Sequence, residues 1–230
     1  MKNKELNRLI DHLQFYFHQE IKKIYVSDEQ SELNIEFLLF EPNEDFPFYK
    51  VVTAGASDYQ MPEGNGSLPN RNEYMIFLSK DFDISSNEFN LYLSFLSYVA
   101  TYAYYEKTNV TVGHSFSIDQ FKIRDFVGAQ IMFPQILVDS YTLRCKLGMF
   151  KTIACLQVMT LTKQELDELF KIGPMLMEEK FYPIIDVHAT WKAFNPVQGC
   201  PNKCRYCFLN GIGMTHRKPV VLCSPEEAVE

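Results

Sequence analysis

Three cysteines near the C-terminal end of the sequence carry its clearest chemical signal. Cys200, Cys204 and Cys207 follow a C-x3-C-x2-C pattern. An iron–sulfur cluster is ordinarily held by four cysteine thiolates. A compact set of three thiolates can therefore hold three irons of a four-iron cluster and leave the fourth iron open to another ligand. The spacing predicts a 4Fe-4S site of this kind.

Zinc is the alternative metal for the same thiolates, with His216 or Cys223 as the fourth ligand. Structural zinc sites usually contain paired C-x2-C elements, and this segment has a single one. Four of the six cysteines lie between positions 200 and 223, which favours metal binding over a disulfide framework. The two others, Cys145 and Cys155, are predicted to be buried core residues.

The residues around these cysteines add a family resemblance. The stretch Trp191–Gly199 leads into the cysteine loop, and Tyr206 stands directly before the last cysteine. This segment resembles the start of the radical S-adenosylmethionine (SAM) family. The resemblance implies that Cys200, Cys204 and Cys207 bind the cluster, that SAM completes its fourth iron, and that Tyr206 lies near the bound SAM.

The same resemblance predicts a separate C-terminal domain over residues 188–230, equivalent to the first unit of a radical SAM partial barrel. Such a barrel needs about six strand–helix units of roughly 30 residues each, and this segment supplies barely one. We expect no radical catalysis from these 230 residues; that they come from a longer radical SAM enzyme is an alternative hypothesis. Ser224-Pro225-Glu226-Glu227 has the composition of a helix start, so the sequence ends inside an element.

Composition limits the classes of partner. The chain has a formal net charge of −7, and residues 188–230 contain five Lys/Arg and three Asp/Glu, which leaves −9 for residues 1–187. An acidic chain of this kind argues against nucleic-acid binding, which requires clustered cations. The longest apolar stretch, Leu91–Tyr104, is too short to span a membrane. With no apolar leader after Met1, a cytoplasmic protein is expected.

The periodicity of residues 1–187 predicts an α+β domain with a mixed or antiparallel sheet packed against helices. Pro134 suggests an edge strand or a bulge, and the aromatic helix that contains Tyr92 is expected to be buried on nearly every side. Helices are predicted over residues 4–24, 86–107 and 162–178, the last opened by a capping box at Thr162–Glu165. Strands are predicted over 31–40, 47–54, 72–79, 130–138, 151–161 and 181–187.

Several short motifs within this domain resemble the Suppressor of fused family over residues 25–187. They are Phe48–Ser57, Met61-Pro62, Asn72-Glu73-Tyr74, Leu78–Phe82, Gly113-His114 and Thr160–Leu166. The resemblance implies a protein-binding module over residues 1–187 and not an enzyme. Bacterial members are often linked to toxin neutralisation as immunity proteins, and an acidic surface would suit a basic toxin.

Three hypotheses follow for the whole chain. The first is a protein-interaction module, of the immunity-protein kind, that carries an incomplete radical SAM segment. The second is the N-terminal part of a radical SAM enzyme whose first domain recruits a protein or peptide substrate. The third is a small interaction protein stabilised by zinc. His114, Asp186 and His188 are not accompanied by a nucleophile signature, so we predict no catalytic residues among them.

Overall fold

The computed structural model describes residues 1–27, 32–63, 68–134, 144–173, 197–198 and 220–221. The chain divides into two units, Met1–Phe181 and Tyr182–Glu230. In the second unit, β9 (Val197–Gln198) pairs antiparallel with β10 (Val220–Val221). All other described elements belong to the first unit, and its α+β architecture confirms the predicted fold class.

One eight-stranded sheet forms the centre of the first unit. The strand order is β1-β2-β3-β4-β8-β6-β5, and β7 also pairs with β8. Every pairing is antiparallel except β4–β8, which is parallel. The strands are β1 (Lys23–Val26), β2 (Glu36–Phe40), β3 (Phe48–Ala54), β4 (Asn72–Ser79), β5 (Ser115–Ser117), β6 (Phe126–Met132), β7 (Arg144–Lys146) and β8 (Thr152–Thr162).

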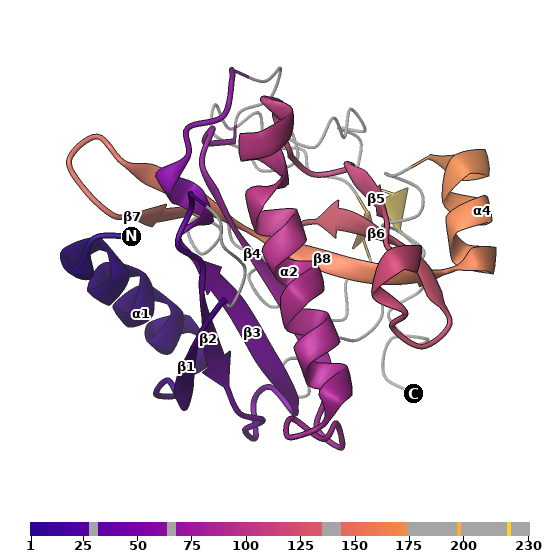
Figure 1. Ribbon diagram of the computed structural model, residues 1–230, viewed down its shortest axis with the longest axis horizontal. Coiled ribbons are helices and arrows are strands. Elements are labelled where there is room, and N and C mark those ends of the chain that lie inside the picture. The colour runs from indigo at the N-terminus through magenta and orange to yellow at the C-terminus, as the bar shows by residue number, and fades with distance from the viewer. Residues whose placement is uncertain (28–31, 64–67, 135–143, 174–196, 199–219, 222–230) are drawn as a thin grey trace. The chain divides into compact units, whose positions relative to one another are not determined.

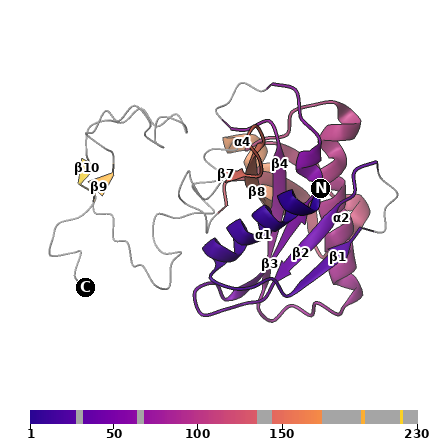
Figure 2. The ribbon, with the colours of Figure 1, turned by 90° about the vertical axis from the view of Figure 1, so that its left-hand side faces the viewer.

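Two helices pack on opposite faces of this sheet, as Figure 2 shows. Helix α2 (Asn87–Glu106) covers one face, and its Phe95 and Val99 belong to the larger hydrophobic core. Helix α1 (Asn3–Phe17) covers the other face through Leu9, Leu13 and Phe17. Along each strand, side chains contribute alternately to the two cores, because successive side chains point to opposite faces of a sheet. Burial of each such Leu, Val or Phe contributes about 1.5–3 kcal/mol.

Shorter helical elements make up the rest of the helical structure described in the first unit. Helix α4 (Lys163–Ile172) packs beside β6 and β8, where Leu169 contacts Leu161 in a small third cluster. Its N-cap, Thr162, forms the predicted capping box with Glu165. Two 3-10 turns, η1 (Ala56–Asp58) and η2 (Asp119–Phe121), follow β3 and β5. None of the helices that the structure describes combines the length and the hydrophobicity of a membrane span.

The structure corrects four of the predicted elements. The first helix was expected to continue to residue 24, but it ends at Phe17 because His18 adopts a left-handed conformation with φ of 52°; the following residues form β1. The strand predicted over 130–138 is β6, which ends before Pro134 and lies between β8 and β5. Pro134 therefore marks no edge, and the irregular register of β6 falls between Phe126 and Gly128.

Helix α2 was expected to be buried on nearly every side, but the structure exposes part of its surface. Its Leu91 and Tyr105 are exposed, and Figure 1 shows the helix lying on the front of the sheet. Its sequence is apolar on nearly every side because an amphipathic aromatic residue, Tyr105, occupies part of its outer surface. The helix predicted over 162–178 is also too long, because α4 ends at Ile172, where Gly173 leaves the helical conformation with φ of 84°. The strand predicted over 181–187 lies outside the described residues.

Candidate functional site

The predicted metal and cofactor residues lie outside the part of the chain that the structure describes. These are Cys200, Cys204, Cys207 and Tyr206, together with the alternative zinc ligands His216 and Cys223. Among the described residues, no group of three or more His, Cys, Asp or Glu side chains is placed to hold a metal ion. Cys145 and Cys155 are buried free thiols, as predicted.

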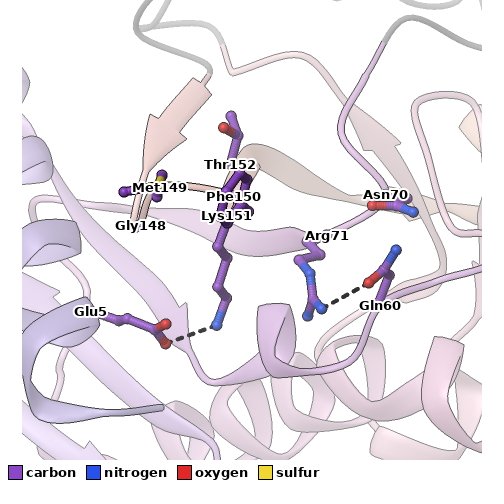
Figure 3. A pocket seen from close by; sticks show the side chains of 9 residues that line it. All are labelled: Glu5, Gln60, Asn70, Arg71, Gly148, Met149, Phe150, Lys151 and Thr152. Atoms are coloured by element: carbon purple, nitrogen blue, oxygen red, sulfur yellow. Dashed lines mark hydrogen bonds and ion pairs between the residues drawn. The ribbon is translucent and has the colours of Figure 1, made fainter.

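The described residues instead form a polar cleft where two central strands begin (Figure 3). Arg71 directly precedes β4 and Lys151 directly precedes β8. Because these strands are parallel, their starting ends lie at the same edge of the sheet. The N–H of Ala154 donates to the carbonyl of Arg71 at 2.9 Å and sets this alignment. Two cations that are distant in the sequence are thereby brought to one surface.

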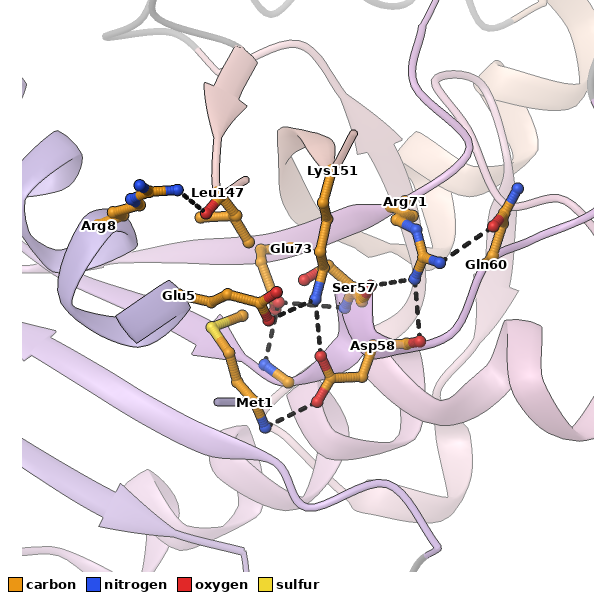
Figure 4. A network of polar contacts seen from close by, with 11 residues as sticks. Met1, Glu5, Arg8, Ser57, Asp58, Gln60, Arg71, Glu73, Leu147 and Lys151 are labelled. Atoms are coloured by element: carbon orange, nitrogen blue, oxygen red, sulfur yellow. Dashed lines mark hydrogen bonds and ion pairs between the residues drawn. The ribbon is translucent and has the colours of Figure 1, made fainter. Parts of the chain in front are cut away.

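A buried carboxylate anchors the turn on which the cleft is built (Figure 4). Glu73 of β4 is fully buried and accepts the Thr53 hydroxyl at 2.6 Å. Its other oxygen accepts the backbone N–H groups of Gly55 at 2.9 Å and Ser57 at 3.1 Å. Burial raises the pKa of Glu73, and these hydrogen bonds offset part of that rise. The contacts hold η1 against the end of β3.

Gly55 is required at the start of this turn for two reasons. Its φ of +128° lies in a region that side-chain-bearing residues rarely adopt. A Cβ at this position would also lie 2.1 Å from the backbone oxygen of Asn34. The turn can therefore follow β3 this closely only with glycine, which explains the Gly in the Phe48–Ser57 motif.

The anchored turn presents its carbonyl groups to Arg71. The guanidinium donates to the carbonyl oxygens of Ser57 at 2.7 Å and Asp58 at 2.9 Å, and to Gln60 Oε1 at 3.0 Å. All three acceptors are uncharged. No carboxylate among the described residues forms an ion pair with Arg71, so its positive charge is not neutralised in this cleft.

The charge of Lys151, by contrast, is compensated by two carboxylates. Its Nζ lies 3.0 Å from Glu5 Oε2 and 2.8 Å from Asp58 Oδ1. The second oxygen of Asp58 lies 2.7 Å from the α-amino group of Met1. Burial alone would raise the pKa of Asp58, but the hydrogen bonds from Lys151 and the α-amino group lower it overall. Lys151 therefore links α1 to η1, and Arg71 is the cation left for a ligand.

The β7–β8 hairpin forms the apolar side of the cleft. Leu147 and Gly148 both donate backbone N–H groups to the carbonyl of Lys151, at 2.8 and 3.1 Å, and close a tight turn. At its tip, the side chains of Met149 and Phe150 are 81% and 95% exposed. The cleft has a volume of about 460 Å3 and is lined by Glu5, Gln60, Asn70, Arg71 and the hairpin residues Gly148–Thr152.

This arrangement places an uncompensated cation beside exposed apolar surface, a combination suited to binding another protein or a peptide. None of its residues was predicted from the sequence. Two sequence signals could have identified the cleft residues. Arg71 directly precedes the Asn72-Glu73-Tyr74 motif, and two adjacent large apolar residues follow Gly148 in a turn. His114, by contrast, is half-buried against Tyr102 and Phe116, and burial lowers its pKa.

Comparisons with known proteins agree with this architecture. Residues 31–188 match the family model described as Suppressor of fused protein. A Suppressor of fused homolog from Neisseria gonorrhoeae aligns with a TM-score of 0.54 and 16% identity, covering 78% of this chain and 90% of that chain. No curated protein matches the chain.

Two further solved structures share the fold. The Sufu–Fu complex aligns with a TM-score of 0.52 and 14% identity, covering 76% of this chain and 82% of that chain. Drosophila Suppressor of Fused aligns with a TM-score of 0.55 and 13% identity, covering 76% of this chain and 46% of that chain. At such low identity these similarities concern the fold.

Proposed function

This chain belongs to the Suppressor of fused protein family, and from that premise we propose that its first unit is a protein-interaction module. The observation that carries the proposal is the β7–β8 tip, where Phe150 is 95% and Met149 81% exposed beside the uncompensated Arg71. Two adjacent large apolar side chains in water are unfavourable unless a partner covers them, and aromatic, Met and Arg side chains are enriched in interfaces. The Sufu–Fu structure is itself a protein complex.

The partner proposed from the family resemblance is a bacterial toxin, which the chain would neutralise as an immunity protein. The formal net charge of −7 supports a partner with a basic surface, because opposite charges accelerate encounter. The alternative partner is a protein or peptide substrate of a radical SAM enzyme. Cytoplasmic localisation is part of the same proposal, because the free thiols of Cys145 and Cys155 suit a reducing compartment.

A pull-down with the products of neighbouring genes tests the interaction. The immobilised full chain should retain a partner, and Phe150→Ser should weaken retention. Phe170→Ser is the matched control, since Phe170 is 72% exposed on α4, away from the hairpin, and it should leave retention unchanged. Failure to retain any of these products across a range of salt concentrations would contradict the proposal.

For residues 188–230, the proposal is a 4Fe-4S site at Cys200, Cys204 and Cys207, with SAM bound beside Tyr206. The donor set fits the group, because cysteine thiolates are the usual ligands of iron–sulfur clusters and three of them leave one iron for SAM. The cluster would supply an electron for reductive cleavage of SAM. The chain's own contribution would be the three thiolates and the aromatic ring.

Anaerobic reconstitution with iron and sulfide tests this site. The full chain should become brown and bind iron and sulfide, and Cys204→Ala should not. Cys223→Ala is the control, because Cys223 lies outside the C-x3-C-x2-C pattern. Stoichiometric zinc in the purified protein, lost in Cys204→Ala and in either Cys223→Ala or His216→Ala, would support the zinc alternative instead.

A further inference from the structure

We propose that the cleft beside Arg71 binds a partner segment in which an Asp or Glu side chain stands next to a large apolar residue. This inference rests on the protein-interaction function proposed above and gives its partner a chemistry. The carboxylate would pair with Arg71, and the apolar side chain would cover the tip residues Met149 and Phe150. The site is defined by Arg71, Met149, Phe150 and the turn residues that hold Arg71.

The electrostatic part of the inference depends on the contrast between the two cations of the cleft. Lys151 lies 3.0 Å from Glu5 and 2.8 Å from Asp58, so its charge is already compensated. Arg71 donates three hydrogen bonds, all to uncharged oxygens. A guanidinium has five N–H donors, so two remain for a ligand. A carboxylate is the group that these donors match best, because it can accept two parallel hydrogen bonds.

The same contacts prepare Arg71 for binding. The turn that accepts its hydrogen bonds is held by Glu73, which is fully buried and fixes the N–H groups of Gly55 and Ser57. A side chain already held in place loses less conformational entropy when a ligand arrives. The guanidinium is therefore oriented before the partner binds, as Figure 4 shows for the contacts of Arg71 with η1 and Gln60.

The apolar part of the inference comes from the hairpin. Met149 and Phe150 follow one another at the tip and line the same cleft as Arg71 (Figure 3). A thioether and an aromatic ring adapt well to an apolar partner side chain. The carboxylate of Glu5 also lines the cleft, but Lys151 holds it. Repulsion of an incoming acidic side chain is thereby reduced.

This local preference is compatible with an acidic chain. The net charge of −7 acts over long distances during encounter, whereas Arg71 acts at hydrogen-bond distance once the surfaces meet. A partner with a basic surface and one exposed acidic residue next to an apolar residue would satisfy both. The position of the acidic residue would fix the orientation of the complex.

The test uses the full chain and a phage-displayed library of random peptides. Each peptide is fused to the phage coat protein through its C-terminus, so it has no free C-terminal carboxylate, and its carboxylates all belong to Asp or Glu side chains. We expect selection to enrich peptides with Asp or Glu beside a large apolar residue. A selected peptide is then synthesised with an amidated C-terminus, together with its Asp→Asn or Glu→Gln counterpart. Affinities are measured for the wild type, Arg71→Gln and Phe150→Ser.

Removal of the acidic group should weaken binding to the wild type about tenfold, and Arg71→Gln should produce a similar loss. In Arg71→Gln, the acidic and amide peptides should bind equally, because a double-mutant cycle isolates the pair. Phe150→Ser should also lower the affinity about tenfold. Because Phe150 is exposed, this substitution should not impair folding. Lys163→Gln and Phe170→Ser should leave the affinity unchanged.

Peptides that bind equally well without their acidic group, or that bind Arg71→Gln and Phe150→Ser normally, would overturn this inference. Enrichment of no peptide would overturn it as well. In each case the pull-down with neighbouring gene products separates the two proposals. If the pull-down retains a partner through another surface, the proposed interaction function stands and only the inference about the Arg71 cleft is wrong. If neither peptides nor gene products bind, both proposals are wrong.

Discussion

The carboxylate of Glu73 and the hydroxyl of Thr53 meet between β4 and β3, with 2.6 Å between Oε2 and Oγ1 and both side chains fully buried. The same hydroxyl oxygen accepts the backbone N–H of Tyr74 at 2.8 Å. A chain of hydrogen bonds therefore joins β4, β3 and the turn η1 in the interior. Hydrogen bonds to a buried carboxylate are stronger than neutral ones, so Glu73 should matter greatly to stability.

We expect Glu73→Gln to lower the free energy of unfolding by about 2 kcal/mol, because an amide cannot accept on both sides and leaves a buried donor unsatisfied. Urea denaturation of the full chain measures the change. Glu41→Gln is the control: Glu41 is exposed and paired with Lys22 at 3.4 Å, so its loss should cost less than about 0.5 kcal/mol. Equal effects of the two substitutions would contradict the role given to Glu73.

Gly55→Ala should lower the free energy of unfolding by about 3 kcal/mol, because a Cβ would enter a strained backbone region and collide with a neighbouring carbonyl. That carbonyl oxygen belongs to Asn34 and would lie 2.1 Å from the new atom. Gly148→Ala offers a matched comparison, since its Cβ would meet only Lys151 Cβ, at 3.8 Å. Its effect should remain within about 0.5 kcal/mol, and thermal denaturation would distinguish the two variants.

Lys50 predicts an unusual pH dependence. It is fully buried on β3, and its Nζ donates to Gln19 Oε1 at 2.7 Å and lies near the rings of Phe17, Phe46 and Phe48. No described carboxylate forms an ion pair with it. Burial lowers its pKa from 10.5 to about 8. Between these values the unfolded chain binds more protons, so this residue makes stability rise with pH.

Lys50→Met should therefore increase the free energy of unfolding by about 2 kcal/mol below pH 8, because it removes a buried charge that has no counter-ion. The advantage should shrink as the pH rises from about 8 towards 10.5. Urea denaturation at several pH values measures it. Lys163→Met, at an exposed position of α4, should change stability by less than about 0.5 kcal/mol. A gain for Lys50→Met that persists above pH 10.5 would argue against this explanation.

The two buried thiols should be chemically inert in the folded protein. Burial raises the pKa of Cys145 to about 12 and that of Cys155 well above its usual value. Because the thiolate is the reactive form, iodoacetamide at neutral pH should modify neither residue in the native chain. Both should react once urea has unfolded the protein. Peptide mass spectrometry reads out each site, and rapid native alkylation of Cys145 would show that it is not protected.

Much of the local structure follows from the sequence. Alternating and buried apolar runs identify β2, β3, β4 and β8, and the Thr162–Glu165 pattern predicts the start of α4 through its own hydrogen bonds. The end of α1 could not be predicted in the same way. Ile21 and Ile24 continue its helical spacing, but His18 reverses the chain so that β1 can pair with β2. Pairing with a distant strand outweighs a weak local preference.

By itself, the sequence determined the α+β class, the family resemblance, and the cysteine spacing that predicts a 4Fe-4S site, because these depend on residue type and periodicity. Only the tertiary structure decided where Arg71, Lys151 and the Met149–Phe150 tip come together. Their meeting depends on the parallel pairing of β4 with β8 and on the burial of Glu73. Neither leaves a local pattern in the sequence, because contacts between distant segments are set by packing of the whole core.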